Sequence, residues 1–123
     1  MLQTFHCATC GLALTGALQP LTDPHLIAEV DAEPRVPKGY FFVENDDCLT
    51  QFANNFIVNL TDLRNTRRHT DSNRLNGCCG LDGCDGRNLL CANEHEIGTE
   101  QSDCWLPHSA ALDPQCVMSR EAT

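Results

Sequence analysis

The sequence predicts a mainly β fold in a single domain. The chain has 123 residues, 41% of them hydrophobic, so it is long enough to bury one core. Short runs of apolar, aromatic and β-branched residues alternate with clusters of Gly, Pro and Asn, which is typical of strands joined by turns. The domain would span residues 1–123, with residues 116–123 expected to form a frayed tail.

The N-terminal third is expected to hold three strands. Residues 1–18 fit two short strands around a turn at residues 7–11. Residues 19–38 carry four prolines among acidic residues, so we expect a loop there. Residues 39–43 then form a good strand candidate, because Tyr, Phe and Val suit a pleated sheet.

Residues 46–60 leave two alternatives open, and a small α+β fold is therefore possible. Apolar residues recur there at helical spacing after Asp46 or Asp47, either of which suits an N-cap. Residues 56–60 fit a strand equally well. We expect a turn of helix followed by a strand.

The last half of the chain is expected to alternate irregular segments with strands. Residues 61–76 are polar and hold half of the basic residues. Residues 76–86 are rich in glycine, which disfavours regular structure and allows turns with positive φ. Residues 96–104 and 108–112 fit a final pair of strands.

Charge and hydropathy exclude several classes of function. The formal net charge of −9 disfavours nucleic-acid binding, which needs a positive surface, and disfavours adhesion to anionic membranes. The same charge favours a basic protein partner. No apolar run reaches membrane-spanning length and the N-terminus does not resemble a secretion signal, so we expect a cytoplasmic protein. Disulfides are rare in that compartment, so its nine cysteines indicate metal binding or catalysis.

The strongest local pattern is Cys7-x-x-Cys10-Gly11, which is typical of a zinc knuckle. Two thiolates at this spacing bind one metal from a tight turn, and the glycine lets the backbone fold back. The best candidates for the other half of a tetrahedral Zn²⁺ site are Cys91 and His95, at C-x3-H spacing. Cys78, Cys79 and Glu94 are the rivals of His95 for the fourth position.

Over residues 7–12 and 91–97 the chain resembles a zinc-ribbon protein, in which two metal-binding knuckles each lead into a strand. The resemblance implies a structural zinc and a β-rich elaboration between the knuckles. Glu94 stands where the second knuckle of that family has a cysteine. The segments 76–91 and 100–105, with the pattern GCCGxDGxDGxNxxC in the first, also resemble a group of small uncharacterised bacterial proteins, a resemblance that implies no activity.

Cys78, Cys79, Cys84 and Cys104 form a possible second cluster. A second zinc, a disulfide such as Cys84–Cys104, and packed free thiols are the alternatives. Adjacent cysteines usually point apart, so we expect Cys78 and Cys79 to serve different partners. Trp105 is expected to pack as a core residue over this cluster, with Asp103 orienting the loop.

These observations favour a non-enzymatic zinc module that binds a protein partner. The alternative is a thiol-dependent enzyme or redox protein that uses Cys78 or Cys79, with His69 or His108 as the base and Arg74 and Arg87 nearby in sequence. The basic residues between Arg64 and Arg74 are the best candidates to contact a phosphate or an acidic partner.

Overall fold

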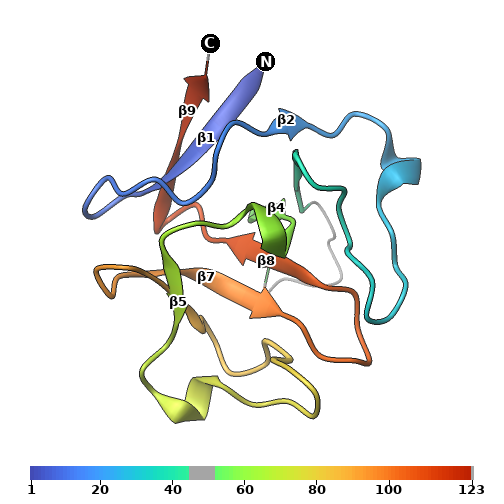
Figure 1. Ribbon diagram of the computed structural model, residues 1–123, viewed down its shortest axis with the longest axis vertical. Helices are drawn as coiled ribbons and strands as arrows, with labels where there is room; N and C mark the ends of the chain where they lie inside the picture. The colour runs from blue at the N-terminus through green and yellow to red at the C-terminus, as the bar shows by residue number, and fades with distance from the viewer. Residues whose placement is uncertain (45–51, 123) are drawn as a thin grey trace.

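The computed structural model describes residues 1–44 and 52–122 and confirms the mainly β fold (Figure 1). The strands are β1 (Leu2–Cys7), β2 (Gln19–Pro20), β3 (Tyr40–Val43), β4 (Phe56–Val58), β5 (Thr66–Arg68), β6 (Leu89–Cys91), β7 (Glu96–Gln101), β8 (Ser109–Leu112) and β9 (Val117–Ala122). The helical elements in this part of the chain are single 3₁₀ turns, η1 (Pro24–Leu26), η3 (Leu60–Asp62) and η4 (Ser72–Arg74). None of them has the length and apolarity of a membrane span.

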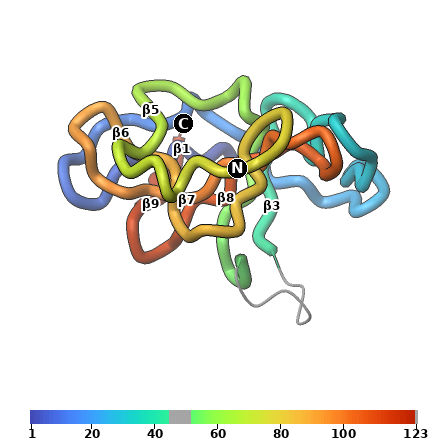
Figure 2. The backbone as a smooth tube through the Cα atoms, turned by 90° about the horizontal axis from the view of Figure 1, so that it is seen from below, coloured from blue at the N-terminus to red at the C-terminus, as the bar shows by residue number. Residues whose placement is uncertain are grey.

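The strands form a seven-stranded sheet and a two-stranded sheet. The larger sheet has the order β2-β3-β4-β8-β7-β6-β5, and all its pairs are antiparallel except β2–β3. Figure 2 shows β6, β7, β8 and β3 following one another across the molecule in this order. The expected strands at 39–43, 96–104 and 108–112 correspond to β3, β7 and β8.

The C-terminal segment differs from the expected frayed tail, because Val117–Ala122 forms β9. This strand pairs antiparallel with β1 along its whole length, from Leu2 opposite Ala122 to Cys7 opposite Val117. The two ends of the chain therefore lie side by side (Figure 1). Backbone pairing with β1, rather than an apolar face, holds this polar segment in place.

On its other edge, β1 forms an N-terminal hairpin with residues 13–18, which pair through isolated bridges and not as the second strand that was expected. Leu14 donates its N–H to Phe5 O at 2.8 Å, and Gln3 and Leu18 exchange backbone hydrogen bonds of 2.8 Å. The turn of this hairpin contains the Cys7-x-x-Cys10 motif. The strand that leads into this motif is therefore hydrogen-bonded on both of its edges.

The ambiguous segment 46–60 ends in a strand, as expected. β4 lies between β3 and β8, and Asn54 before it has a φ of 67°, which fits the turn-like Asn54–Asn55 pair. The expected turn of helix falls largely on residues 45–51, which lie outside the described residues.

The main core joins the N-terminal hairpin to the large sheet. Phe5 packs against Phe41 and Phe56, with ring centroids 5.0 and 4.8 Å away. Cys7 and Cys91 belong to the same buried cluster, at 0% exposure each. The hairpin turn and the β6–β7 turn are therefore held together by apolar packing directly beside the cysteine motifs.

Candidate metal centre

The first metal-binding turn begins at the end of β1. Cys7 is buried at the end of the strand, and its carbonyl accepts a 2.7 Å hydrogen bond from the N–H of Gly11. Cys7 N–H donates to Leu12 O at 2.9 Å, which closes the turn. Gly11 has a φ of 77°, a conformation that glycine adopts without steric cost. The chain thus reverses at Gly11 and Cys10 faces back toward Cys7.

The second turn joins β6 to β7. Cys91 is the last residue of β6 and His95 immediately precedes β7. Cys91 N–H donates to His95 O at 2.9 Å, and Glu94 N–H donates to Cys91 O at 2.9 Å. Glu94 has a φ of 69°, in the left-handed region that lets the strand return after so few residues. Cys91 and His95 therefore flank one tight turn.

The two turns bring all four sequence-predicted ligands together. The sulfur atoms of Cys7, Cys10 and Cys91 and a ring nitrogen of His95 all lie within 4.8 Å of one another. Cys10 Sγ is 3.9 Å from Cys91 Sγ, and His95 Nδ1 is 3.4 Å from Cys91 Sγ. His95 Nδ1 is also 3.7 Å from Cys7 Sγ.

These separations suit a tetrahedral zinc ion. Zn–S bonds of about 2.3 Å and Zn–N bonds of about 2.0 Å, at tetrahedral angles, place two sulfurs about 3.8 Å apart and a sulfur and a nitrogen about 3.5 Å apart. The sulfur–sulfur and sulfur–nitrogen distances between these turns lie within a few tenths of an ångström of those values. Three cysteines and one histidine are also a donor set that zinc favours.

Glu94, a rival for the fourth position, lies in an ion pair instead. Its carboxylate Oε1 is 3.4 Å from Arg67 Nη1, and both side chains are half exposed. The other rivals, Cys78 and Cys79, belong to a separate cluster with Cys104. His95 is therefore the rival that the structure brings to the other three ligands.

Hydrogen-bond donors face the exposed ligand sulfur. Asn93 donates its side-chain amide to Cys10 Sγ at 3.4 Å, and the backbone N–H of Leu12 also faces this sulfur. Hydrogen bonding lowers the pKa of the Cys10 thiol from 9.0 to about 6, the Asn93 amide contributing most, then the Leu12 N–H, with His95 and Cys7 adding less. Burial instead raises the pKa of the Cys91 thiol. A bound cation would offset that cost of ionising Cys91.

Three of the four residues in the possible second cluster also come together. The sulfurs of Cys78, Cys79 and Cys104 lie within 4.8 Å of one another at the surface, and Cys79 and Cys104 form a disulfide. The Cys84–Cys104 pairing is therefore wrong, and Cys84 lies outside this group as an exposed free thiol. The sulfur atoms of Cys78 and Cys79 also lie closer together than expected, since adjacent side chains usually point apart.

Asp103 positions this cluster, as the sequence suggested. Its side chain is fully buried and accepts hydrogen bonds from the backbone N–H groups of Cys78, Cys79 and Cys104 at 2.8, 2.9 and 2.7 Å. The indole N–H of Trp105 donates to the same carboxylate at 2.7 Å. These donors, led by the N–H of Cys79, lower the pKa of Asp103 to about 2.

Trp105 does not pack as a core residue, in contrast to the expectation. It is 55% exposed, because its bond to buried Asp103 holds only the indole nitrogen inward. The ring thus lies at the surface beside the cysteine cluster.

The histidines proposed as bases for a reactive cysteine are engaged elsewhere. His69 Nδ1 accepts the N–H of Asp71 at 3.0 Å, so Nε2 carries the proton and donates to Glu96 at 2.9 Å. His108 Nε2 lies 3.0 Å from the carbonyl oxygen of Asp103, which only accepts, so this nitrogen is also a donor. Neither arrangement gives Cys78 or Cys79 a base.

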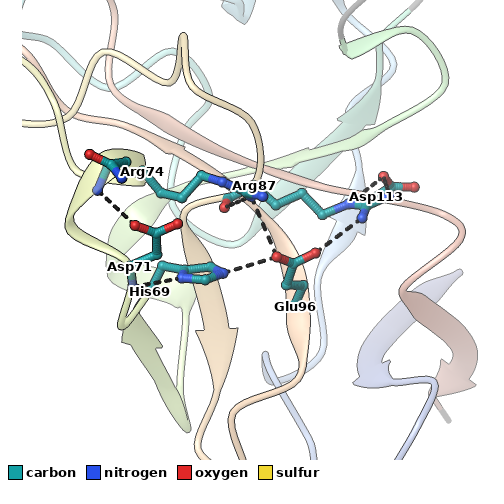
Figure 3. Close-up of polar contacts among 7 residues, drawn as sticks. His69, Asp71, Arg74, Arg87, Glu96 and Asp113 are labelled. Carbon is teal, nitrogen blue, oxygen red and sulfur yellow. Dashed lines mark hydrogen bonds and ion pairs between the residues drawn. The ribbon is translucent and has the colours of Figure 1, made fainter.

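The arginines proposed to help that cysteine belong to a network on β7 that the sequence did not indicate (Figure 3). Glu96 contacts Arg74 Nη1 at 3.4 Å and Arg87 Nη1 at 3.2 Å, and Arg87 Nη2 lies 2.8 Å from Asp113. Hydrogen bonding from His69 first, and then from Arg87, lowers the pKa of Glu96. The network borders a groove of about 340 Å³.

The basic segment between Arg64 and Arg74 is largely neutralised by acidic neighbours. Arg67 faces Glu94, and Arg68 Nη2 lies 3.2 Å from Glu100 Oε2. Arg74 contacts Glu96 within the network. Three of the four arginines of this segment therefore already face a carboxylate, which disfavours the expected role in binding a phosphate.

No family model, curated protein or solved structure matches the chain.

Proposed function

We propose that the protein is a zinc-binding module in which one structural Zn²⁺ is held by Cys7, Cys10, Cys91 and His95. The observation that carries the proposal is the convergence of three sulfurs and one imidazole nitrogen from two knuckle-like turns, at separations that suit tetrahedral zinc. The two turns and the hairpins that carry them support a zinc-ribbon-like centre with a histidine in place of one cysteine.

The donor set supports a structural rather than a catalytic ion. A catalytic zinc usually keeps three protein ligands and an open position, whereas four protein ligands complete the tetrahedron here. Cys7 and Cys91 lie in the main core, and the thiolates also make zinc a weak Lewis acid. The ion would fasten the N-terminal hairpin to the β6–β7 hairpin, so metal binding and folding would be coupled.

The wider role that we propose is non-enzymatic binding of a protein partner. The alternative, a thiol-dependent enzyme or redox protein using Cys78 or Cys79, receives no base from His69 or His108. The net charge of −9 favours a basic partner, whose binding should weaken as salt is raised. Titration of purified basic proteins at two salt concentrations tests this, and salt-independent or absent binding would contradict it.

Elemental analysis of protein purified without added metal or chelator tests the zinc centre. We expect about one zinc per chain in the wild type. His95→Ala should lower the zinc affinity by at least about tenfold, because it removes a ligand. Glu94→Ala is the matched control, since it changes the adjacent residue in the same turn, whose carboxylate faces Arg67, and should leave the affinity unchanged.

Alkylation of the native protein separates the structural site from a reactive cysteine. Zinc should protect Cys7, Cys10 and Cys91 from a small alkylating reagent, and a chelator should expose at least Cys10, which lies at the surface. Absence of zinc, or equal zinc affinity in His95→Ala and Glu94→Ala, would refute the proposed centre. If Cys78 were alkylated faster than the thiol of a small unstructured peptide, that result would instead favour the enzyme alternative.

A further inference from the structure

The exposed cluster of Cys78, Cys79 and Cys104 has the geometry of a second thiolate site. Its three sulfurs lie within 4.8 Å of one another, although Cys79 and Cys104 are separated by 25 residues in sequence. The disulfide occupies two of them and leaves Cys78 as an exposed free thiol. We name these three residues the thiol triad.

The triad is held together by more than its disulfide. The buried carboxylate of Asp103 accepts the N–H groups of all three cysteines, which come from two separate segments. Ser102 and Leu81 add a second connection, with Ser102 N–H donating to Leu81 O at 2.8 Å and Leu81 N–H donating to Ser102 Oγ at 3.1 Å. The three sulfurs should therefore stay together when the disulfide is opened.

Glycine allows the two segments to approach this closely. A Cβ atom on Gly80 would collide with the carbonyl of Ser102, and one on Gly77 would collide with the carbonyl of Gly80. Gly77 also has a φ of 154°, which side chains rarely adopt. The glycine-rich pattern therefore serves to seat Cys78 and Cys79 against Asp103.

The surroundings favour binding of a cation over nucleophilic chemistry. The backbone N–H groups of the triad are directed to Asp103 and not to sulfur. His108 donates to a carbonyl and Arg74 and Arg87 contact Glu96, so these groups do not stabilise a thiolate at the triad. A divalent cation would supply the positive charge that three neighbouring thiolates require.

We propose that the thiol triad is a redox-controlled site for a thiophilic cation such as Zn²⁺, distinct from the centre at Cys7, Cys10, Cys91 and His95. In the disulfide form only Cys78 is available, so the site is closed. Once the disulfide is reduced, three sulfurs bind the cation from one side, and its fourth position faces solvent because all three residues are exposed.

Opening the site requires a two-electron reductant, for which a low-molecular-weight thiol suffices. Two thiol molecules transfer two electrons and two protons to the Cys79–Cys104 disulfide, whose S–S bond breaks while one new S–S bond forms between the two reductant sulfurs. Zn²⁺ then displaces three thiol protons and forms three Zn–S bonds. A small disulfide reverses the sequence, restoring the protein disulfide, releasing the cation and returning a proton to Cys78.

Metal counting before and after reduction tests the proposal on the full chain. Zinc-loaded protein is desalted and reduced with a phosphine. It is then supplied with Zn²⁺ alone and desalted again. Zinc is measured by elemental analysis before and after reduction, and thiols are counted in denaturant at the same two points. We expect about one zinc per chain before reduction and about two afterwards, with two more thiols. A weaker chelator should remove the added zinc than is needed to remove the first, because the triad offers three ligands instead of four and its backbone N–H groups are directed to Asp103.

Cys78→Ser should abolish the second zinc, whereas Cys84→Ser, an exposed cysteine on the same segment, should keep it. The Cys79→Ser/Cys104→Ser double variant should never gain it, with or without reduction. Trp105, the single tryptophan, gives a second readout: Co²⁺ added to the reduced, zinc-loaded wild type should quench its emission, and should fail to do so in Cys78→Ser.

A zinc count that reduction leaves unchanged would overturn the proposal, as would equal counts in Cys78→Ser and Cys84→Ser. The outcome is separable from that of the first centre. If oxidised protein held no zinc but reduction added one that Cys78→Ser removed, the triad would stand and the first centre would fall.

Discussion

Removal of the Asn93 side-chain amide should weaken zinc binding in a pH-dependent way. Asn93 donates to Cys10 Sγ at 3.4 Å and is the main cause of the lowered pKa of that thiol. Zinc binds the thiolate, so protons compete with the metal for Cys10. In Asn93→Ala the thiol pKa should rise back toward 9.0 and the competition should grow.

The size of the effect follows from the ionised fraction of Cys10. At about pH 7, a thiol with a pKa of about 6 is roughly nine-tenths ionised, whereas one with a pKa of 9.0 is about one-hundredth ionised. Complete loss of the shift would therefore weaken zinc binding about 90-fold. The Leu12 N–H remains in the variant, so we expect a loss of about tenfold, within the range for partners that support metal ligands.

Competition with a chromophoric chelator between about pH 6.5 and 9.5 measures this loss. The ratio of wild-type to Asn93→Ala affinity should approach one at the alkaline end, where both thiols are ionised. Asn76→Ala is the control, because Asn76 is another exposed asparagine and donates to Asp85 at 2.8 Å, away from the centre. A loss that is constant across this pH range would refute the proton-competition argument, as would no loss at neutral pH.

Three further predictions concern stability. Chelation of zinc should lower the free energy of unfolding by about 4 kcal/mol, if free zinc exceeds its dissociation constant about a thousandfold. For a chain this long, the melting temperature in calorimetry should then fall by about 15 °C, and the control Cys84→Ser should show the same fall. An unchanged melting temperature would contradict a structural zinc. Glu96→Gln should destabilise by about 1 kcal/mol in urea unfolding above about pH 5, allowing for solvent screening of the network. Since the folded pKa of Glu96 lies below its ordinary 4.5, that difference should vanish as the pH falls through the lowered pKa, and a difference that persists in acid would contradict the ion-pair reasoning. Arg35→Ala removes the guanidinium that lies 2.7 Å from the buried Glu44 carboxylate, and it should lower the free energy of unfolding by about 3 kcal/mol. Lys38→Ala, at an exposed position, should lower it by less than about 0.5 kcal/mol. Equal losses in the two variants would show that the buried ion pair contributes nothing to stability.

The local sequence predicts the candidate centre better than it predicts the rest of the fold. The Cys7–Gly11 and Cys91–His95 turns are specified by short-range residue spacing, so their form was predictable, and the shared metal chemistry suggested that they meet. The C-x3-H spacing already favoured His95, but the ion pair with Arg67 that engages its rival Glu94 is not visible in the spacing.

The C-terminal strand could not be predicted from its residues. Val117 is the only buried residue of β9, so the strand lacks the alternation of buried apolar and exposed polar residues that identifies a half-buried strand. It is specified by pairing with β1 at the other end of the chain. The Glu96 network was missed for a similar reason, because its arginines and carboxylates come from distant segments.

The direction of the N–H donors distinguishes the two cysteine clusters. At the proposed zinc centre, the Asn93 amide and the Leu12 N–H face the Cys10 sulfur and stabilise its thiolate before any metal arrives. At the thiol triad, the equivalent backbone donors are directed to Asp103, so the sulfurs are positioned without being activated. This difference supports the proposals that the first cluster holds a structural zinc and that metal binding by the second depends on its redox state. Asp103→Asn would remove the charge of the carboxylate that accepts those three N–H groups. Once the Cys79–Cys104 disulfide is reduced, the variant should let the triad sulfurs separate, while the hydrogen bonds to Cys10 stay intact.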